Sequence, residues 1–566
     1  MVMVMVARLS RLLLKVAREE GSMKADTELD VVIVGAGFAG LYALHKMRSM
    51  GYRVHALEAG SDVGGTWYWN RYPGARCDVP SIEYSFSFDP DLQQEWNWTE
   101  LMATQPEILA YANHVADRFE LRKHIRFNTR VNSACFDESA KSWRVKTDSG
   151  DEITARFCIM ATGALSEPNM PRVEGYESFK GEAYHTARWP KEPIDLSNKR
   201  VGVFGTGSSG IQAIPILAKQ SKHLTVLQRT PHFTIPANNK PLTREYIASV
   251  KSQYARIREE ARHAPEGLCG EKYSFGGRED GRLDESAPSV KDSTIQERAR
   301  LLDQYGFGAI RMFSDLFTDV EANEMLCELF REQVRRIVND PKTAEGLLPT
   351  GYPMGCKRIA FDTDYYATFN RDNVSLIDFR AEPLECLTSN GIRTTAAEYE
   401  FDCLVYATGF DAMTGALMRM EIVGEGGKRL NDYWADGPRS YLGLQVAGFP
   451  NLFTITGPGS PSVLSNVMVS IEQHVEWVAE CLGYMDAQDY TVIKASGEAE
   501  NQWVQEANAV ASQTSLAAPS CHSWYLGTNI SGKPRMMMPY VGGVGEYRAK
   551  CDKVAKDGYA GFIFSS

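Results

Sequence analysis

The 566-residue sequence lacks closely spaced cysteines, an excess of basic side chains and any apolar run long enough to cross a bilayer. Its eleven cysteines include no CxxC pair, and the closest two, Cys386 and Cys403, are 17 residues apart. This spacing argues against a zinc knuckle or a local dithiol pair, and scattered cysteines suit a reducing compartment. The net charge of −11 argues against nucleic-acid binding, which requires a basic face. We therefore expect a cytoplasmic protein that binds neither a metal ion nor nucleic acid.

The first 22 residues, MVMVMVARLSRLLLKVAREEGS, combine apolar residues with four basic ones. They are too short and too charged to span a membrane. They match either an amphipathic transit or membrane-surface helix, or a frayed extension before a second start at Met23. Glu19 and Glu20 close the basic stretch and no cleavage pattern follows, which favours the extension. We expect residues 1–27 to be an N-terminal extension without membrane association, and the pattern assigns no purpose to 1–22.

Two strand–turn–helix–strand units stand out along the chain. The first runs from LDVVIV at 29–34 through GAGFAG to RVHALEAG at 53–60, and the second occupies 200–231 with the turn GTGSSG. Apolar strands within 155–163 and 401–409 both end in Ala-Thr-Gly, where small residues leave room for a cofactor across strand ends. These patterns predict an α/β protein with two Rossmann-like dinucleotide-binding domains.

Charged, helix-forming segments between 237 and 345 predict a helical insertion in the second of these domains. We expect the first domain to comprise residues 28–165 and 395–566, and the second to comprise 166–236 and 346–394. The glycine- and charge-rich stretch at 265–290 is typical of a loop, and it indicates no function.

The two glycine-rich turns predict two different nucleotides. Glycines permit a tight turn and close approach to a pyrophosphate at a helix N-terminus. Glu58 lies 18 residues after Gly40, where a carboxylate can bind a ribose hydroxyl. Arg229 lies 19 residues after Gly210, and its guanidinium suits a 2′-phosphate, unless it is only a solvated surface charge. FAD in the first domain and NADPH in the second satisfy both patterns.

Two further segments have unusual compositions. The aromatic stretch GGTWYWNRYPGARCD at 64–78 fits either a surface against the flat flavin ring or an aromatic mini-core. Asp78 at its end is harder to explain as core, because a buried carboxylate requires a partner. The segment FKGEAYHTARWP at 179–190 has neither helical nor strand periodicity, and a lone histidine such as His185 is usually a hydrogen-bonded structural residue.

Together these segments resemble the Baeyer–Villiger monooxygenases, flavoproteins with two Rossmann domains. The family fingerprint FxGxxxHxxxWP is matched by Phe179, Gly181, His185, Trp189 and Pro190. A second fingerprint is matched at Gly64, Gly65, Trp67, Tyr72, Pro73, Gly74 and Asp78. The resemblance covers nearly all of 28–560 and is nearest to the phenylacetone monooxygenase branch, through stretches such as QEWNWTE, GPGSPSVLSN and SIEQHVEWV.

The resemblance implies that NADPH reduces FAD, that a C4a-peroxyflavin forms with O2, and that a ketone becomes an ester or lactone. It implies an apolar pocket for aryl-alkyl or bulky cyclic ketones, with sulfoxidation as a side activity. We expect a monomer or weak homodimer. The pattern assigns neither the physiological ketone nor the regio- and enantioselectivity.

The resemblance also assigns residues. Arg358 stabilises the anionic intermediates and Asp78 orients it. Lys357 binds the 2′-phosphate of NADP, although an adjacent Lys-Arg pair alone is more typical of a solvated patch. Trp524 belongs to a mobile loop over the cofactor, although a tryptophan considered alone is more typical of a protein core. The fingerprint residues Phe179, Gly181, His185 and Trp189 form a hinge between domains.

The resemblance also implies which residues contact the substrate and which contact the cofactors. Ser462, Val463, Leu464 and Val467 line the substrate pocket. The cofactor contacts are Gly35, Gly37, Phe38, Gly40, Glu58, Gly65, Thr66, Trp67, Asp78, Tyr84, Val131, Gly205, Thr206, Gly207, Ser208, Ser209, Gly210, Arg229, Thr230, Lys357, Arg358 and Trp524.

Three alternatives remain. An N- or S-oxygenating flavin monooxygenase would keep both cofactors, but Trp189 and Pro190 disfavour it because such relatives carry a shorter fingerprint. Asp78 and Arg358 argue against an NADPH oxidase that releases only H2O2. A non-catalytic nucleotide sensor would leave this pair unexplained.

Overall fold

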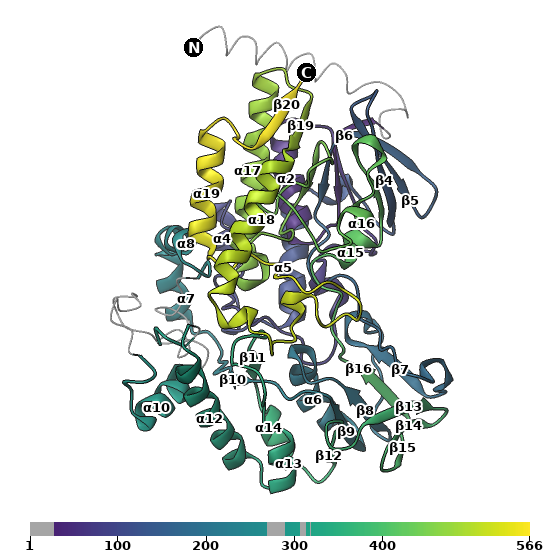
Figure 1. Ribbon diagram of the computed structural model, residues 1–566, viewed down its shortest axis with the longest axis vertical. Coiled ribbons are helices and arrows are strands. Elements are labelled where there is room, and N and C mark those ends of the chain that lie inside the picture. The colour runs from purple at the N-terminus through teal and green to yellow at the C-terminus, as the bar shows by residue number, and fades with distance from the viewer. Residues whose placement is uncertain (1–27, 269–288, 306–312, 317) are drawn as a thin grey trace.

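The computed structural model describes residues 28–268, 289–305, 313–316 and 318–566, which form an upper and a lower lobe (Figure 1). The expected N-terminal extension and most of the 265–290 stretch lie outside the described residues. Each lobe contains one large sheet. The chain leaves the upper sheet after β6 (Glu152–Met160) and returns to it at β17 (Glu421–Val423), so the upper lobe is discontinuous in sequence.

Within the described residues, the upper sheet has eight strands. Val31, Val32 and Ile33 of β1 (Glu28–Val34) are fully buried, as expected for a central strand covered on both faces. The strand order is β17, β4 (Val131–Asp137), β5 (Ser142–Thr147), β6, β1, β2 (Val54–Leu57) and β3 (Ile125–Arg126), and β18 (Leu452–Thr454) also pairs with β6.

The lower sheet contains five parallel strands among the described residues, in the order β12 (Val374–Asp378), β9 (His223–Gln228), β8 (Arg200–Phe204), β16 (Cys403–Tyr406) and β7 (Glu182–His185). The sequence places β16 in the upper domain, because the expected boundary falls at 395. That assignment is wrong for this strand, since β16 pairs with both β8 and β7. An apolar strand before Ala-Thr-Gly has the same pattern in either sheet, so sequence alone does not separate them.

Both glycine-rich turns have the same geometry. Gly35 and Gly205 have φ of +107° and +101°, a region that favours glycine. A Cβ on either would lie 2.5 Å from a carbonyl oxygen, that of Ala161 after β6 or of Ala407 after β16. The small residues of Ala-Thr-Gly therefore allow each turn to pass close to the neighbouring strand. Helices α2 (Phe38–Ser49) and α6 (Ser208–Gln220) follow these turns.

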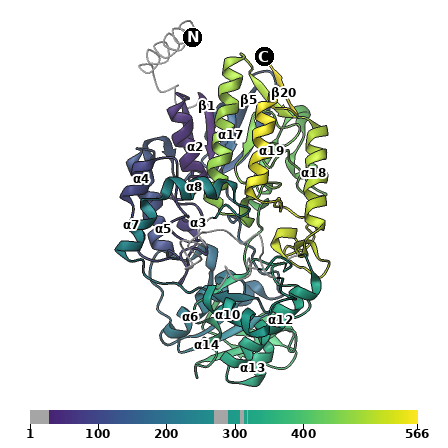
Figure 2. The same cartoon turned by 90° about the vertical axis from the view of Figure 1, so that its left-hand side faces the viewer.

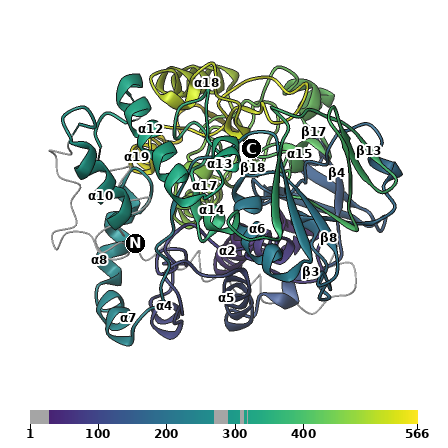
Figure 3. The same ribbon diagram turned by 90° about the horizontal axis from the view of Figure 1, so that it is seen from below.

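The helical insertion divides between the lobes (Figure 2), and much of it lies along one side of the molecule when seen from below (Figure 3). Helices α10 (Ile295–Tyr305), α12 (Val320–Ile337) and α13 (Pro341–Gly346) lie on the lower lobe, whereas α7 (Arg244–Lys251) and α8 (Tyr254–His263) lie beside the upper one. Arg258 of α8 donates hydrogen bonds of 3.0 Å to the carbonyls of Ile82 and Glu83, and α8 packs against α19 (Val544–Lys556). The expectation that the whole insertion belongs to the second domain is therefore wrong for α8.

Long helices cover the upper sheet. Helix α17 (Val467–Ala487) packs against α2, and α5 (Gln105–Arg118) lies on the other side of α2. Buried side chains of these helices join those of β1 and β6 in one apolar core. Among the described residues, no helix combines the length and the apolar character that a membrane span requires.

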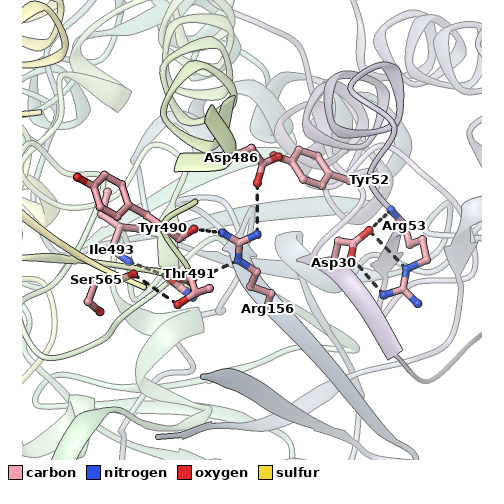
Figure 4. A network of polar contacts seen from close by, with 10 residues as sticks. Asp30, Tyr52, Arg53, Arg156, Asp486, Tyr490, Thr491, Ile493 and Ser565 are labelled. Carbon is pink, nitrogen blue, oxygen red and sulfur yellow. Dashed lines mark hydrogen bonds and ion pairs between the residues drawn. The ribbon is translucent and has the colours of Figure 1, made fainter. Parts of the chain in front are cut away.

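Arg156 on β6 forms hydrogen bonds that connect the C-terminal part of the chain to the upper sheet (Figure 4). Its guanidinium donates to the carbonyls of Thr491 and Tyr490, and it lies 3.3 Å from the Asp486 carboxylate at the end of α17. Thr491 leads into β19 (Val492–Ala495), which forms a two-stranded antiparallel sheet with β20 (Phe562–Ser565). One side chain thus connects the central sheet, a covering helix and this C-terminal two-stranded sheet.

We predict that Arg156→Met lowers the free energy of unfolding of the holoprotein by about 1–3 kcal/mol, because it leaves several acceptors without their charged donor. Arg53→Met is the matched control, since the Arg53 side chain is 57% exposed in its pair with Asp30. The control should change stability by less than about 1 kcal/mol. Thermal unfolding of the FAD-loaded proteins measures both, and equal shifts would contradict the prediction.

Candidate active site

A cavity of about 1150 Å³ lies between the lobes, at the carboxyl ends of the parallel strands of both sheets. All of the expected cofactor contacts line it except Gly40 and Gly210. These two glycines pack beneath their helices instead, since a Cβ on Gly40 would lie 1.9 Å from the carbonyl oxygen of Gly35, and one on Gly210 would lie 2.1 Å from that of Gly205. Among the described residues, no cluster of metal-ligating side chains occurs.

The two helix N-termini at the cavity suit pyrophosphate groups. Helices α2 and α6 begin after Gly37 and Gly207, and neither has a side-chain cap or an acidic residue in its first turn. The first backbone N–H groups of such helices have no partner within the helix and carry the positive end of its dipole. The residues present therefore fit one dinucleotide at each turn.

Glu58 holds the upper glycine-rich turn in place. Its carboxylate accepts hydrogen bonds from the backbone N–H groups of Ala36, at 2.8 Å, and Gly60, at 2.6 Å. Burial raises the pKa of Glu58, and these two hydrogen bonds oppose that rise. A carboxylate has about four acceptor positions. The side chain can therefore hold the turn and still accept from a ribose hydroxyl in the cavity.

Two cationic side chains meet in the lower lobe. Lys357 and Arg229 both line the cavity, and burial together with Arg229 lowers the pKa of Lys357 to about 8. Two like charges held close together favour an anionic ligand between them. This pair fits the 2′-phosphate of NADP. His232 lies beside them, and burial and the Lys357 charge lower its pKa to about 4, so it adds no third charge at neutral pH.

Arg358 and Asp78 form a bidentate ion pair at the cavity wall. The Nε–Oδ2 and Nη2–Oδ1 distances are both 2.7 Å, and Nη1 donates to the carbonyl of Val463 at 2.8 Å. The two side chains are 30% and 20% exposed. Burial alone would lower the pKa of Arg358, but the Asp78 carboxylate more than offsets this effect and the pKa is raised. The guanidinium therefore remains charged and fixed in orientation.

The aromatic stretch at 64–78 is both cavity wall and core. Trp67 and Tyr84 line the cavity, and the Trp67 Nε1 donates to the Tyr84 hydroxyl at 3.0 Å. Tyr72 donates to Gln212 of α6 at 2.7 Å, so this segment contacts the lower lobe. Gly74 allows that contact, because a Cβ there would lie 2.3 Å from the carbonyl oxygen of Gln212. The segment ends at Asp78 and thereby fixes the position of the carboxylate.

The residues of the first fingerprint do not line the cavity, but His185 is connected to it through one hydrogen-bond partner, Thr408. Its Nδ1 accepts from the N–H of Ala187 at 3.0 Å, and its Nε2 lies 3.2 Å from Thr408 Oγ1. Thr408 lines the cavity and donates to the carbonyl of Asn169 at 2.6 Å. Burial lowers the pKa of His185 to about 4, so the imidazole is neutral. His185 therefore links the segment at Ala187 to the turn at Thr408. Its neutral imidazole does not transfer protons to the cavity.

The remaining fingerprint residues pack against one another or the lower core. A Cβ on Gly181 would lie 2.4 Å from the Phe179 ring and 2.8 Å from the carbonyl of Asp402, so the glycine allows this ring to pack there. Trp189 is 9% exposed and belongs to the lower core. Of the expected pocket residues, Val463 and Val467 line the cavity, whereas Ser462 and Leu464 do not.

Sequence reasoning missed several residues at the site. Thr162 and Thr408, from the two Ala-Thr-Gly tripeptides, both line the cavity, as does Gln212 of α6. The repeated tripeptide was a usable signal for the threonines. Cys356 and Cys521 form a disulfide beside the site, and their separation of 165 residues gave no sign of it.

Comparison with known proteins supports this picture. A pyridine nucleotide-disulphide oxidoreductase family model matches residues 32–264. The chain is 41% identical to the 2-oxo-Δ3-4,5,5-trimethylcyclopentenylacetyl-CoA monooxygenase of Pseudomonas putida, covering 94% of this chain and 98% of that one. It is 39% identical to a Baeyer–Villiger monooxygenase of Pseudooceanicola batsensis (96% and 98% covered). It is 40% identical to a phenazine N-monooxygenase of Lysobacter antibioticus (95% and 98% covered).

Solved structures agree with the architecture. An oxidised steroid monooxygenase bound to NADP has a TM-score of 0.88 and 48% identity, covering 95% of this chain and all of that chain. A closed cyclohexanone monooxygenase has a TM-score of 0.90 and 40% identity, covering 95% and 99%. The expected α/β fold and the expected FAD and NADP cofactors are confirmed. The chain belongs to the Baeyer–Villiger monooxygenases, which use FAD and NADPH to oxidise ketones.

Proposed function

We propose that the protein oxidises aryl-alkyl or bulky cyclic ketones and that Arg358 stabilises the negative charge that develops on oxygen during this reaction. FAD, when bound, carries electrons from NADPH to dioxygen and delivers one oxygen atom to the ketone. The observation that carries the assignment is the bidentate pair of Arg358 with Asp78 at the cavity wall.

The geometry of Arg358 leaves donors for a reacting oxygen. A guanidinium has five N–H groups, and three of the Arg358 nitrogens each donate once to Asp78 or Val463. The Tyr525 hydroxyl is a further partner of the guanidinium, which leaves at least one N–H group for an anionic oxygen in the cavity. Because Asp78 and Val463 hold the guanidinium in place, it needs little reorganisation as negative charge develops on the reacting oxygen. Asp78 acts as a positioning residue for Arg358.

The cavity wall beside Arg358 supports an apolar substrate. Val463, Val467 and Ile471 line it, and the indole of Trp524 lies in the loop over the same cavity. Apolar walls exclude water, which strengthens the electrostatic effect of the guanidinium. Sulfoxidation is a proposed side activity of the same site. We propose a monomer or weak homodimer. We propose the cytoplasm as its location, since eight of the ten cysteines that the structure describes are free.

Oxygenation of a heteroatom is the second candidate function. The phenazine N-monooxygenase at 40% identity supports it, because it shares nearly the full length of this chain. Ketone oxidation needs negative charge on oxygen to be stabilised, whereas transfer of oxygen to nitrogen or sulfur does not. The dependence of each activity on Arg358 therefore separates the two candidates.

The test uses purified FAD-loaded protein, NADPH, labelled O2 and phenylacetone, with bulky cyclic ketones, an aryl sulfide and phenazine in parallel. One labelled oxygen in benzyl acetate or in a lactone supports the proposal. Product from the sulfide or phenazine with none from any ketone would overturn it in favour of the second candidate. NADPH consumption with H2O2 alone across all substrates would overturn both.

We predict that Arg358→Ala lowers ester formation by at least about a hundredfold, the effect of losing a donor to a developing oxyanion. Reduction of the flavin by NADPH should stay within severalfold of wild type, as measured by stopped-flow absorbance. Asp78→Asn is the companion variant, since it keeps the shape of the partner and removes its charge. Ester formation by Arg358→Ala near the wild-type rate would show the assignment to be wrong.

A second prediction concerns the pH dependence of NADPH binding. Because the pKa of Lys357 is lowered to about 8 by burial and by Arg229, its ammonium is charged below that pH and neutral above it. The KM for NADPH should therefore rise as pH increases through this value, approaching about tenfold per pH unit. The profile for NADH, which has no 2′-phosphate, should stay flat.

Lys357→Arg is the matched control, because a guanidinium keeps its charge over this range. This variant should lose the alkaline rise in KM. The same rise in wild type and in Lys357→Arg would assign the titration to another group.

A further inference from the structure

A disulfide that no sequence pattern indicates lies directly beside the site. Cys356 and Cys521 are joined, with their Cα atoms 5.8 Å apart, a separation that suits a disulfide without backbone movement. Both side chains are fully buried. The other eight cysteines that the structure describes are free. The chain therefore brings one particular pair together.

The disulfide connects two walls of the cavity. Cys356 immediately precedes Lys357 and Arg358, which line the cavity from the lower lobe. Cys521 begins a loop at 521–529 in which Trp524 lines the same cavity, and this Trp524 loop lies between α18 (Gly497–Ser512) and α19. Both helices belong to the upper lobe (Figure 2). The hydroxyl of Tyr525 in this loop also lies beside the Arg358 guanidinium. The cross-link thus ties the loop to the segment that carries both cations.

The loop has partners that do not depend on the disulfide. Arg535 donates to the carbonyl of Cys521 at 2.6 Å, and Asn529 donates to the carbonyl of Phe410 at 2.8 Å. The Sγ of Cys521 lies 3.0 Å from the carbonyl oxygen of Cys356, so the reduced thiol has an acceptor in place. The loop can therefore keep its position in both redox states. Only the disulfide of the oxidised state prevents the two cavity walls from separating.

We infer that Cys356 and Cys521 form a redox-controlled cross-link that hydrogen peroxide makes and a thiol reductant breaks. In the oxidised state it holds the Trp524 loop against the Lys357–Arg358 segment and slows the exchange of NADP. In the reduced state hydrogen bonds alone hold the loop, so it can open, and opening gives peroxide access to the two buried thiols. Loop opening and product release set the turnover rate of many enzymes, so the cross-link lowers the rate of catalysis.

The chemistry balances with peroxide as the oxidant. One thiolate attacks the peroxide, its O–O bond breaks, and a sulfenic acid and hydroxide form. The second thiol attacks that sulfur, the S–S bond forms as the S–O bond breaks, and the oxygen leaves as water. Two thiols are oxidised and one peroxide becomes two waters. A monooxygenase of this class releases peroxide when turnover is uncoupled, and only this source of the oxidant rests on the proposed function.

The experiment treats the wild-type holoenzyme with hydrogen peroxide or with dithiothreitol. Peptide mapping with differential alkylation identifies the cross-link, and stopped-flow displacement measures NADP+ dissociation. Peroxide should join Cys356 to Cys521 and slow both NADP+ dissociation and turnover severalfold, and dithiothreitol should restore them. Cys521→Ser and Cys356→Ser should behave as reduced wild type under both treatments. Cys386→Ser, which removes a free and half-buried cysteine, is the matched control and should respond as wild type does.

Two results would overturn the inference. One is recovery of Cys356 and Cys521 as free thiols after peroxide treatment. The other is a complete cross-link with unchanged NADP+ dissociation and turnover. The peptide map and the dissociation rate need no ketone substrate, so they still test the cross-link if the proposed ketone oxidation fails. If either serine variant does not fold, wild type with and without dithiothreitol gives the same comparison.

Discussion

The ion pair between Arg358 and Asp78 is the constraint on which the site depends. Its two residues are 280 positions apart in the chain and come from different lobes. A charge held away from water is tolerated only when it is paired and hydrogen-bonded, and removal of one partner leaves the other uncompensated. The lobes must therefore meet in a geometry that satisfies both side chains. The glycine-rich turns, the aromatic stretch and the Val463 carbonyl all contribute to that geometry.

Much of the cofactor site could be predicted because its residues are set by local constraints. Gly35 and Gly205 adopt positive φ beside a neighbouring strand, and only glycine fits there. Glu58 and Arg229 follow at strand ends, where the chemistry of the side chain reflects the nucleotide. The resemblance carried by the two fingerprints extended this prediction to Lys357, Arg358 and Trp524, all of which line the cavity.

Other features depend on which distant segments meet, and local patterns do not encode that. The strand β16 has the composition of either sheet, and only its pairing with β8 assigns it to the lower one. Ser462 and Leu464 flank Val463 in a short helix at 462–464 but do not line the cavity. The imidazole of His185 is neutral because burial lowers its pKa, an effect to which the Arg188 charge adds. The pairing of Cys356 with Cys521 belongs to the same group of features.

The strand order of the upper sheet has a consequence for biosynthesis. Strand β1 begins at residue 28, but β17 and β18, which complete the same sheet, end at residues 423 and 454. At a synthesis rate of about 5–20 residues per second, the ribosome needs roughly 20–85 s to make the chain between β1 and β18. Until then residues 158–160 of β6, which pair with β18, have no partner on that side, and the sheet lacks its covering helix α17. Nascent and truncated chains therefore expose an aggregation-prone sheet. The yield of folded protein should depend on chaperones and on growth temperature, even if the completed protein is stable.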